Sequence, residues 1–197
     1  MQPILVAYAT FDGQTHKIAE FIAERLRIRG HRVDLVDTAT PSVEAVTPVY
    51  QGAFLGGPVH LQSHPGSLAQ FVKRNRVWLN ALPCAVFSVS LTAALDDIDS
   101  RIEVQRWLNE MIDEFALKPV TARCVAGALK YTQYDYFKRL VVRLIARQRG
   151  QNTDLTKDCE YTDWDDVEAF VDEFLAEAGI PVPTKAPGAE VTQWLRL

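Results

Sequence analysis

The sequence predicts an α/β fold, a three-layer sandwich in which helices cover both faces of a five-stranded parallel sheet. Short, continuous apolar runs alternate along the chain with segments whose apolar residues recur every three or four positions. The stretch 31–36 alternates, with Val33 and Leu35 apolar, whereas the other runs are continuous, and continuous runs imply a parallel sheet that is covered on both faces. Right-handed crossovers between such strands favour the order 2-1-3-4-5.

Each strand is expected where an apolar run stands between turn residues. The pair Gly56-Gly57 marks the end of the third strand. Pro83 marks the entry to the fourth, because proline cannot donate to a central ladder. The five expected strands are, in order, 3–9, 31–36, 53–55, 84–90 and 120–127.

Each helix is expected where apolar residues recur at helical spacing. Gly30 suits the end of the first helix, and Asp96-Asp97 suits the positively polarised start of the third. Thr162 and Asp165 resemble a capping box for the last helix. The apolar positions that mark the four helices are Ile18, Ile22 and Leu26; Leu68, Phe71 and Val72; Ile98, Ile102, Leu108, Ile112 and Phe115; and Val167, Phe170, Val171, Phe174 and Leu175.

The length of 197 residues favours one elaborated domain rather than two. We assign residues 1–179 to this domain. It contains an insertion at about 128–162, near the fifth strand, because a compact domain rarely holds so long a structureless loop. Residues 180–197, which contain three prolines, are expected to form a C-terminal tail.

The composition excludes several classes of protein. Hydrophobic residues make up 48% and charged residues 23%, which argues against disorder and fibrous repeats. The net charge of −4 does not favour nonspecific nucleic-acid binding by the whole molecule. The three cysteines are widely spaced, so neither a disulfide framework nor a zinc site is indicated. No basic leader or uninterrupted spanning segment is visible, and we expect a cytoplasmic protein without a metal site.

The loop after the first strand contains the most suggestive polar residues. Ligands of an open parallel sheet bind beyond the carboxyl ends of the strands where the order reverses, here after strands one, three and four. The first of these loops, Thr10-Phe11-Asp12-Gly13-Gln14-Thr15, offers hydroxyls, a glycine and free helix amides that suit one phosphate. Neither a Walker loop nor a dinucleotide-binding glycine motif is present. The same residue types also turn a chain and cap a helix without any ligand, and this alternative stays open.

The other two loops contain small residues. The third-strand loop, 56–64, is mostly apolar, and the fourth, 88–92, carries hydroxyls. A flat aromatic ring suits the space between them. His60 and His64 have a spacing that a metal pair would use, but no carboxylate or cysteine stands nearby, so a pocket or surface role is favoured.

From Ile4 to about Ala178, the chain resembles the flavodoxin-like, menaquinone-dependent protoporphyrinogen oxidase family of haem biosynthesis. The run Asp12-Gly13-Gln14-Thr15 is similar to that family's FMN-phosphate loop. The most specific likeness lies in the second half, which a bare flavodoxin lacks. Its motifs are Ala126-Gly127-Ala128-Leu129-Lys130-Tyr131, Tyr134-Asp135-Tyr136-Phe137, Arg143-Leu144-Ile145, Thr153-Asp154 and Tyr161-Thr162-Asp163-Trp164.

This resemblance implies a flavodoxin-like fold with noncovalent FMN. It also implies that protoporphyrinogen IX is oxidised to protoporphyrin IX, with a membrane quinone, menaquinone or ubiquinone, as the electron acceptor. The implied phosphate-binding residues are Thr10, Asp12, Gly13, Gln14 and Thr15, and the implied ring contacts are Pro58, Val59, His60, Leu61, Ser90, Leu91 and Thr92. The family pattern has an arginine and an aromatic residue where this chain has His60-Leu61, which puts the substrate pocket in doubt but not the FMN site. No catalytic acid or base is assigned.

The insertion is strongly basic. Residues 130–157 contain seven basic and two acidic side chains, so the segment carries +5 and the rest of the chain −9. Apolar residues interleave with the bases at helical spacing, which predicts an amphipathic helix that binds an anionic membrane surface or the carboxylates of a porphyrinogen. A solvated helix packed on the domain is the alternative, and no motif supports nucleic-acid binding. The candidate substrate or membrane residues are Lys130, Tyr131, Lys138, Arg139, Arg143 and Arg147.

Two other functions remain open at this point. A quinone reductase or an electron-transfer protein would use the same fold and the same flavin, since fold does not fix function. A flavin-free binding module would be colourless and would not take up FMN. The leading hypothesis places the protein peripherally on the inner face of the cell membrane, and the sequence does not indicate an oligomeric state.

Overall fold

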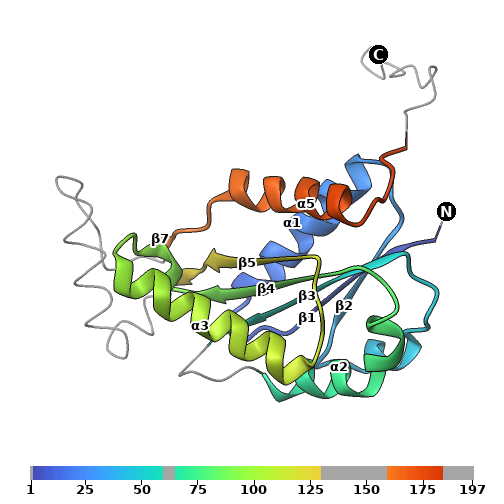
Figure 1. Ribbon diagram of the computed structural model, residues 1–197, viewed down its shortest axis with the longest axis horizontal. Coiled ribbons are helices and arrows are strands. Elements are labelled where there is room, and N and C mark those ends of the chain that lie inside the picture. Colours follow the sequence, from blue (N-terminus) through green and yellow to red (C-terminus); the bar gives the residue numbers. More distant parts are fainter. Residues whose placement is uncertain (1, 60–64, 130–158, 184–197) are drawn as a thin grey trace, which may run out of the picture.

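A five-stranded parallel sheet forms the centre of the computed structural model, which describes residues 2–59, 65–129 and 159–183 (Figure 1). The strands are β1 (Ile4–Tyr8), β2 (Val33–Asp37), β3 (Gly52–Pro58), β4 (Cys84–Ser90) and β5 (Thr121–Ala126). Their order is β2-β1-β3-β4-β5, and every pair is parallel. The predicted strand order is therefore confirmed.

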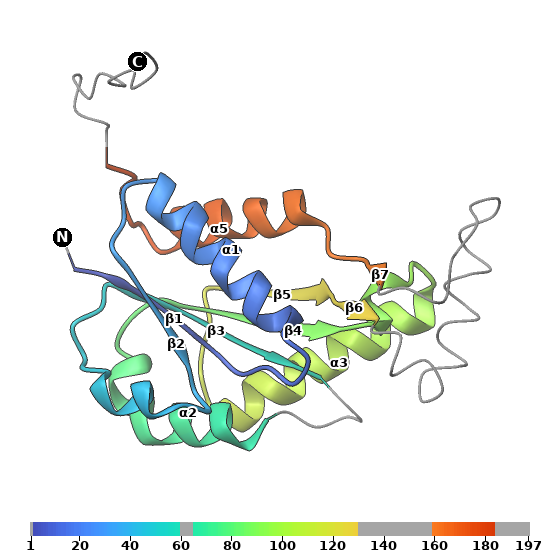
Figure 2. The same ribbon diagram turned by 180° about the vertical axis from the view of Figure 1, so that it is seen from behind.

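Helices cover both faces of this sheet. They are α1 (Gln14–Ile28), α2 (Gly66–Leu79), α3 (Ile98–Phe115) and α5 (Trp164–Glu177), with short 3-10 helices η1 (Pro41–Ala45) and η2 (Thr92–Ala94). Helices α1 and α5 lie on one face, and α2 and α3 lie on the other (Figures 1 and 2). Alternate residues of β1 enter the two cores: Ile4 and Val6 pack with α1 and α5, and Leu5 and Ala7 with α2 and α3.

The helix starts follow their capping residues, with one correction. Asp97 caps α3 as expected, because its carboxylate accepts from the Ser100 backbone N–H at 3.1 Å. The predicted capping role of Thr162 is wrong. The N-cap of α5 is Asp163, which accepts from the backbone N–H groups of Asp165 and Asp166. The Thr162 hydroxyl is engaged elsewhere.

Two strand boundaries also differ from expectation. Strand β3 continues through Gly56 and Gly57, where the sequence suggested that it ends, because both glycines pair with β4. Strand β2 begins at Val33 rather than at residue 31. The His31 backbone N–H instead donates to the carbonyl of Leu26 at the end of α1, which keeps residue 31 out of the sheet.

A second, two-stranded sheet stands at the root of the expected insertion. Strand β6 (Ala128–Leu129) pairs antiparallel with β7 (Cys159–Glu160), so Leu129 lies opposite Cys159. Residues 130–158, between the two strands, lie outside the described part of the chain. None of the helices in the described ranges is long and apolar enough to cross a bilayer.

The first residues of the expected C-terminal tail pack on the domain. Ile180 is only 8% exposed and joins the core beneath α1 and α5. The ring of Pro183 lies 3.1 Å from the position that a Cβ on Gly30 would take. The domain therefore extends beyond residue 179, at least to Pro183.

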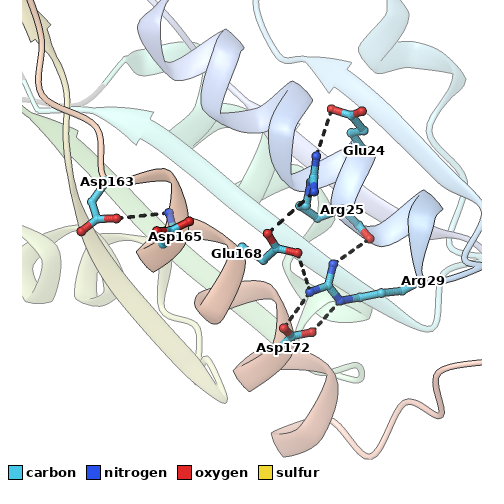
Figure 3. A network of polar contacts seen from close by, with 7 residues as sticks. All are labelled: Glu24, Arg25, Arg29, Asp163, Asp165, Glu168 and Asp172. Atoms are coloured by element: carbon cyan, nitrogen blue, oxygen red, sulfur yellow. Dashed lines mark hydrogen bonds and ion pairs between the residues drawn. The ribbon is translucent and has the colours of Figure 1, made fainter.

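Ion pairs join α1 to α5 along their exposed sides (Figure 3). The Arg29 guanidinium donates to both carboxylate oxygens of Asp172, at 2.5 and 2.6 Å, and to Glu168 at 3.0 Å. Arg25 lies 3.7 Å from Glu168. The hydrogen bonds that Arg29 donates to these carboxylates outweigh burial and raise the pKa of Arg29. The C-terminal half of α1 is thus fixed against α5.

Acid is expected to weaken the fold through His31. This side chain is 4% exposed, and neither ring nitrogen has a hydrogen-bond partner in the described structure. Burial lowers the pKa of His31, so its neutral form is favoured in the folded state. The stabilisation is present above the ordinary histidine pKa of about 6.5 and is lost as pH falls below it, because the unfolded chain then binds the proton more readily. The urea midpoint of the wild type should fall more between pH 7 and pH 5 than that of His31→Phe.

His16→Gln is the control, because His16 is half-exposed and pairs with a carboxylate. This variant should keep the wild-type loss of stability on acidification. If the urea midpoints of the wild type and of His31→Phe fell equally between pH 7 and pH 5, His31 would not be the cause of the acid sensitivity.

Candidate functional site

The carboxyl ends of β1, β3 and β4 meet at one edge of the sheet. Backbone hydrogen bonds continue past the strands there. The N–H of Ala9 donates to Gly56, that of Val59 to Val89, and that of Gly127 to the carbonyl of Ser90, at 2.8–3.0 Å. These hydrogen bonds hold the first residues of the three predicted loops and of β6 against the neighbouring strands. This is the edge at which the sequence predicted a ligand.

The first loop turns the chain into α1 without capping that helix. Gly13 is the N-cap residue and has a left-handed backbone, with φ of 87°. No side chain caps α1, and its first turn contains no acidic residue. A Cβ on Gly13 would meet nothing within 4 Å, so the space beside it is open. The positive end of the helix dipole therefore faces the loop without a negative side chain in its first turn.

The hydroxyl groups of the loop have separate positions. The Thr10 Oγ1 accepts from the Gly13 N–H at 2.9 Å, and it keeps its own proton for donation to a ligand. Thr15 is the second residue of α1 and is only 2% exposed. Asp12 is half-buried, and Phe11 is 58% exposed. The loop thus combines the Thr10 hydroxyl with free amides beside one open turn, an arrangement that suits a phosphate group.

Gln14 is turned away from this loop. Its Nε2 donates to the Thr162 hydroxyl at 2.9 Å, and that hydroxyl donates to the carbonyl of Ala126 at 2.7 Å. The side chain of Gln14 is therefore not available to a phosphate in the loop. A phosphate-binding role for its backbone N–H stays a prediction. The connection to Thr162 crosses 148 positions of sequence, and no local pattern could have indicated it.

Sequence reasoning also missed a set of side-chain contacts beside the loop, between Tyr8, His16 and Glu20. The Tyr8 hydroxyl lies 2.6 Å from His16 Nδ1, and His16 Nε2 lies 3.3 Å from the Glu20 carboxylate. Burial first, and then the negative charges of Asp37 and Glu20, raise the pKa of Tyr8. The Tyr8 hydroxyl and His16 Nδ1 thus share one hydrogen bond, and the other ring nitrogen of His16 faces Glu20. This chain of contacts holds the first turn of α1 against β1.

The described residues at the ends of β3 and β4 are half-buried or buried. Pro58 is the last residue of β3, and Val59 follows it, both half-buried. Ser90 ends β4 and accepts from the Ala93 N–H at 3.2 Å, which starts η2. Leu91 and Thr92 are each 9% exposed. These residues lie side by side at the carboxyl edge of the sheet, because β3 and β4 are paired as far as Pro58 and Val89.

Some predicted site residues fall outside the part of the chain that the structure describes. They are His60, Leu61, Lys130, Tyr131, Lys138, Arg139, Arg143 and Arg147. The described candidates converge on the carboxyl edge, namely Thr10, Asp12, Gly13, Thr15, Pro58, Val59, Ser90, Leu91 and Thr92.

Comparison with known proteins decides the family. The model of the flavodoxin domain matches residues 5–156, which is most of the chain. The chain belongs to the flavodoxin domain family. The resemblance noted in the sequence and the predicted flavodoxin-like fold are therefore confirmed.

Curated relatives of this flavodoxin-domain protein share one name. The present chain is 31% identical over 192 residues to the protoporphyrinogen IX dehydrogenase [quinone] of Leishmania major, and the match covers 94% of this chain and 80% of the relative. It is 28% identical over 169 residues to the protein of the same name from Escherichia coli, covering 86% and 92%. The family and these relatives make the chain a flavin-dependent oxidoreductase.

Solved structures support the fold. Flavodoxin 2 from Bacillus cereus matches with a TM-score of 0.54 at 19% identity, covering 89% of this chain and 99% of that one. A short-chain flavodoxin associated with a bacterial microcompartment matches with a TM-score of 0.52 at 11% identity, covering 90% and 99%. At these identities the likeness concerns the fold alone.

The residues present in this flavodoxin-domain protein fit the phosphate end of a flavin nucleotide. The uncapped start of α1 and the open space at Gly13 form a cradle that a side chain at position 13 would narrow. Thr10 Oγ1 can donate into the cradle, and the loop 10–15 carries no lysine or arginine. Within this loop, amide and hydroxyl donors would therefore hold the phosphate.

Proposed function

We propose that this chain binds FMN noncovalently and oxidises protoporphyrinogen IX to protoporphyrin IX, with a membrane quinone as the electron acceptor. The observation that carries the proposal is the uncapped, acid-free start of α1 at Gly13. This site suits a single phosphate at the edge where β1, β3 and β4 end. The names of the curated relatives supply the substrate and the acceptor class.

The flavin would supply the redox chemistry, removing two electrons at a time so that three oxidations complete the porphyrin. The chain's own residues bind and orient it. Thr10, Gly13 and Thr15 hold the phosphate, while Pro58 and Val59 on one side and Ser90, Leu91 and Thr92 on the other border the ring. His60 and Leu61, which follow Val59 directly, are proposed to border the same ring.

An anaerobic assay tests this function. The protein is loaded with FMN, its flavin spectrum is recorded, and porphyrin fluorescence is followed after protoporphyrinogen IX and menaquinone are added, then ubiquinone in a second series. Porphyrin formation that requires both protein and quinone is expected. A flavin spectrum without turnover would move the function to a quinone reductase or an electron-transfer protein. A colourless protein that takes up no FMN would favour a flavin-free binding module.

The proposed cellular place is the cytoplasm, at the inner face of the cell membrane. The segment 130–157 carries +5, whereas the rest of the chain carries −9. A basic segment of this kind is attracted to anionic lipid by about 1 kcal/mol for each lysine or arginine near the surface. The quinone would reach the flavin at this surface without any need for a spanning helix.

Charge reversal tests the membrane surface. Changing Lys138, Arg139, Arg143 and Arg147 to glutamate should lower affinity for anionic vesicles by at least about 100-fold, following the energy per charge given above. Co-sedimentation with phosphatidylglycerol vesicles measures this loss. The control reverses four exposed bases elsewhere, namely Lys73, Arg74, Arg76 and Lys118. Equal losses in the two variants would contradict a specific role for the insertion.

A further inference from the structure

A hydrogen-bonded chain joins the phosphate loop to the second half of the protein. The Thr162 hydroxyl donates to the carbonyl of Ala126, the last residue of β5, at 2.7 Å. It accepts from Nε2 of Gln14, the first residue of α1, at 2.9 Å. Gln14 is 9% exposed. The chain therefore crosses from the central sheet to the first turn of α1 through largely buried groups.

Glu160 makes a second connection one turn further along α1. Its carboxylate accepts from Lys17 Nζ at 3.2 Å and from the Trp164 indole at 3.0 Å. Burial alone would raise the pKa of Glu160, but hydrogen bonds from Lys17, Gln14 and Trp164 lower it, so this carboxylate stays ionised. The Trp164 ring packs on Phe21, with ring centroids 4.9 Å apart. Strand β7 and the start of α5 thus contact the first two turns of α1 through Glu160 and Trp164.

These contacts decide where the amides of the first turn point. Arg25 and Arg29 fix the far end of α1 to α5 (Figure 3), and the contacts described above hold its first two turns. Gln14 is the first helical residue after the left-handed Gly13. A shift of its side chain therefore moves the amides that would face a phosphate, and such sites lose function with displacements of about 1 Å.

We propose that Thr162 is a positioning residue for the cofactor phosphate, which acts by holding Gln14 and the first turn of α1 in place. The inference rests on the proposed flavin site and adds to it a residue 147 positions away from Thr15 in the sequence. Thr162 does not contact the phosphate itself. Its loss raises the cost of ordering the loop when the cofactor binds.

Two substitutions at one position test the proposal. Thr162→Val keeps the shape but removes both hydrogen bonds, whereas Thr162→Ser keeps the hydroxyl. Apoprotein is titrated with FMN, and flavin fluorescence gives Kd. Thr162→Val should weaken FMN binding about tenfold, which corresponds to about 1.4 kcal/mol, and Thr162→Ser should stay within about twofold of the wild type. Gln14→Met should weaken binding by a similar factor, and the double variant by no more than either single change, because the two side chains act as one unit.

Thr121→Val is the matched control. Thr121 also joins β5 to α5 through its hydroxyl, which donates to Glu173 at 2.6 Å, but it lies at the other end of the strand. The variant Thr121→Val should lower Tm as Thr162→Val does, but it should leave the Kd for FMN unchanged. Equal Kd values for the wild type and Thr162→Val would overturn the inference alone, and so would equal weakening in Thr121→Val. A wild type that does not bind FMN would overturn the proposed function and the inference with it.

Discussion

Gly56→Ala is expected to lower the free energy of unfolding by about 3 kcal/mol, at the upper end of the usual cost of overpacking. Gly56 lies in β3, at the centre of the sheet, directly opposite Phe87 of β4. A Cβ at position 56 would stand 1.9 Å from Cζ of that ring. The Phe87 ring is fully buried and packs edge-on against Phe170, so it has no free space into which to move. Urea unfolding measures the loss.

Two further variants test whether the loss of stability comes from the clash with the Phe87 ring or would follow from replacing any glycine. Gly66→Ala is the control, because a Cβ there meets nothing within 4 Å, and it should leave stability within about 0.5 kcal/mol of the wild type. Phe87→Leu should cost less in the Gly56→Ala background than alone, since it removes part of the obstructing ring. Additive losses would show that the ring is not the obstacle.

The double variant Thr10→Val and Thr15→Val is expected to weaken FMN binding by at least about 100-fold. Each hydroxyl bonded to a charged phosphate contributes about 1.5–3 kcal/mol, and every 1.4 kcal/mol changes Kd tenfold. Both changes keep the shape of the side chain, but Thr10→Val also removes the acceptor of the Gly13 N–H, so the Tm of the variant is measured to check its fold. Fluorescence titration of apoprotein with FMN measures the change.

Thr40→Val is the control for this variant. Its hydroxyl is exposed in the loop after β2, where it bonds to the backbone carbonyl of Asp37. It should bind FMN like the wild type. An unchanged Kd in the double variant, with its fold intact, would return Thr10 and Thr15 to the simpler role of turning the chain.

The sequence predicted those parts of the fold that depend on neighbouring residues. Apolar runs and helical spacing located the strands and helices, because burial on one or both faces leaves a local period. In α3 the spacing located the helix but not all of its buried face, because Ile98 and Ile102 are exposed and Trp107 and Met111 are buried instead. Asp97 was identified as a helix start for the same reason, since a cap contacts residues two or three positions away. Strand β4 has the predicted bounds, 84–90.

The errors arose where distant residues meet. Gly56 looked like the end of a strand, and only the ring of Phe87, from the next strand, explains why a glycine continues it. Thr162 looked like a cap, but its hydroxyl is taken by Ala126 and Gln14. The contact between Tyr8 and His16 depends on the angle between β1 and α1, which no single segment specifies.

The site could be predicted in outline for a related reason. Parallel topology brings the carboxyl ends of strands to one edge, so the candidate loops followed from the strand order. The bonding within the loop did not follow. Thr10 accepts from Gly13, while Gln14 points away toward Thr162. Both roles are set by the turn at Gly13 and by contacts across the fold.

The two-residue pairing of β6 with β7 has a consequence for how such a chain evolves. Antiparallel partners such as Leu129 and Cys159 stand about 5 Å apart, so the two ends of the intervening segment are held as close as those of a hairpin. Lengthening a closed loop adds only about 0.6 kcal/mol per doubling of its length. Sequence between these strands can therefore be gained, lost or exchanged at little cost to the sheet. A change of surface specificity in this segment would leave the carboxyl edge of the five-stranded sheet unchanged.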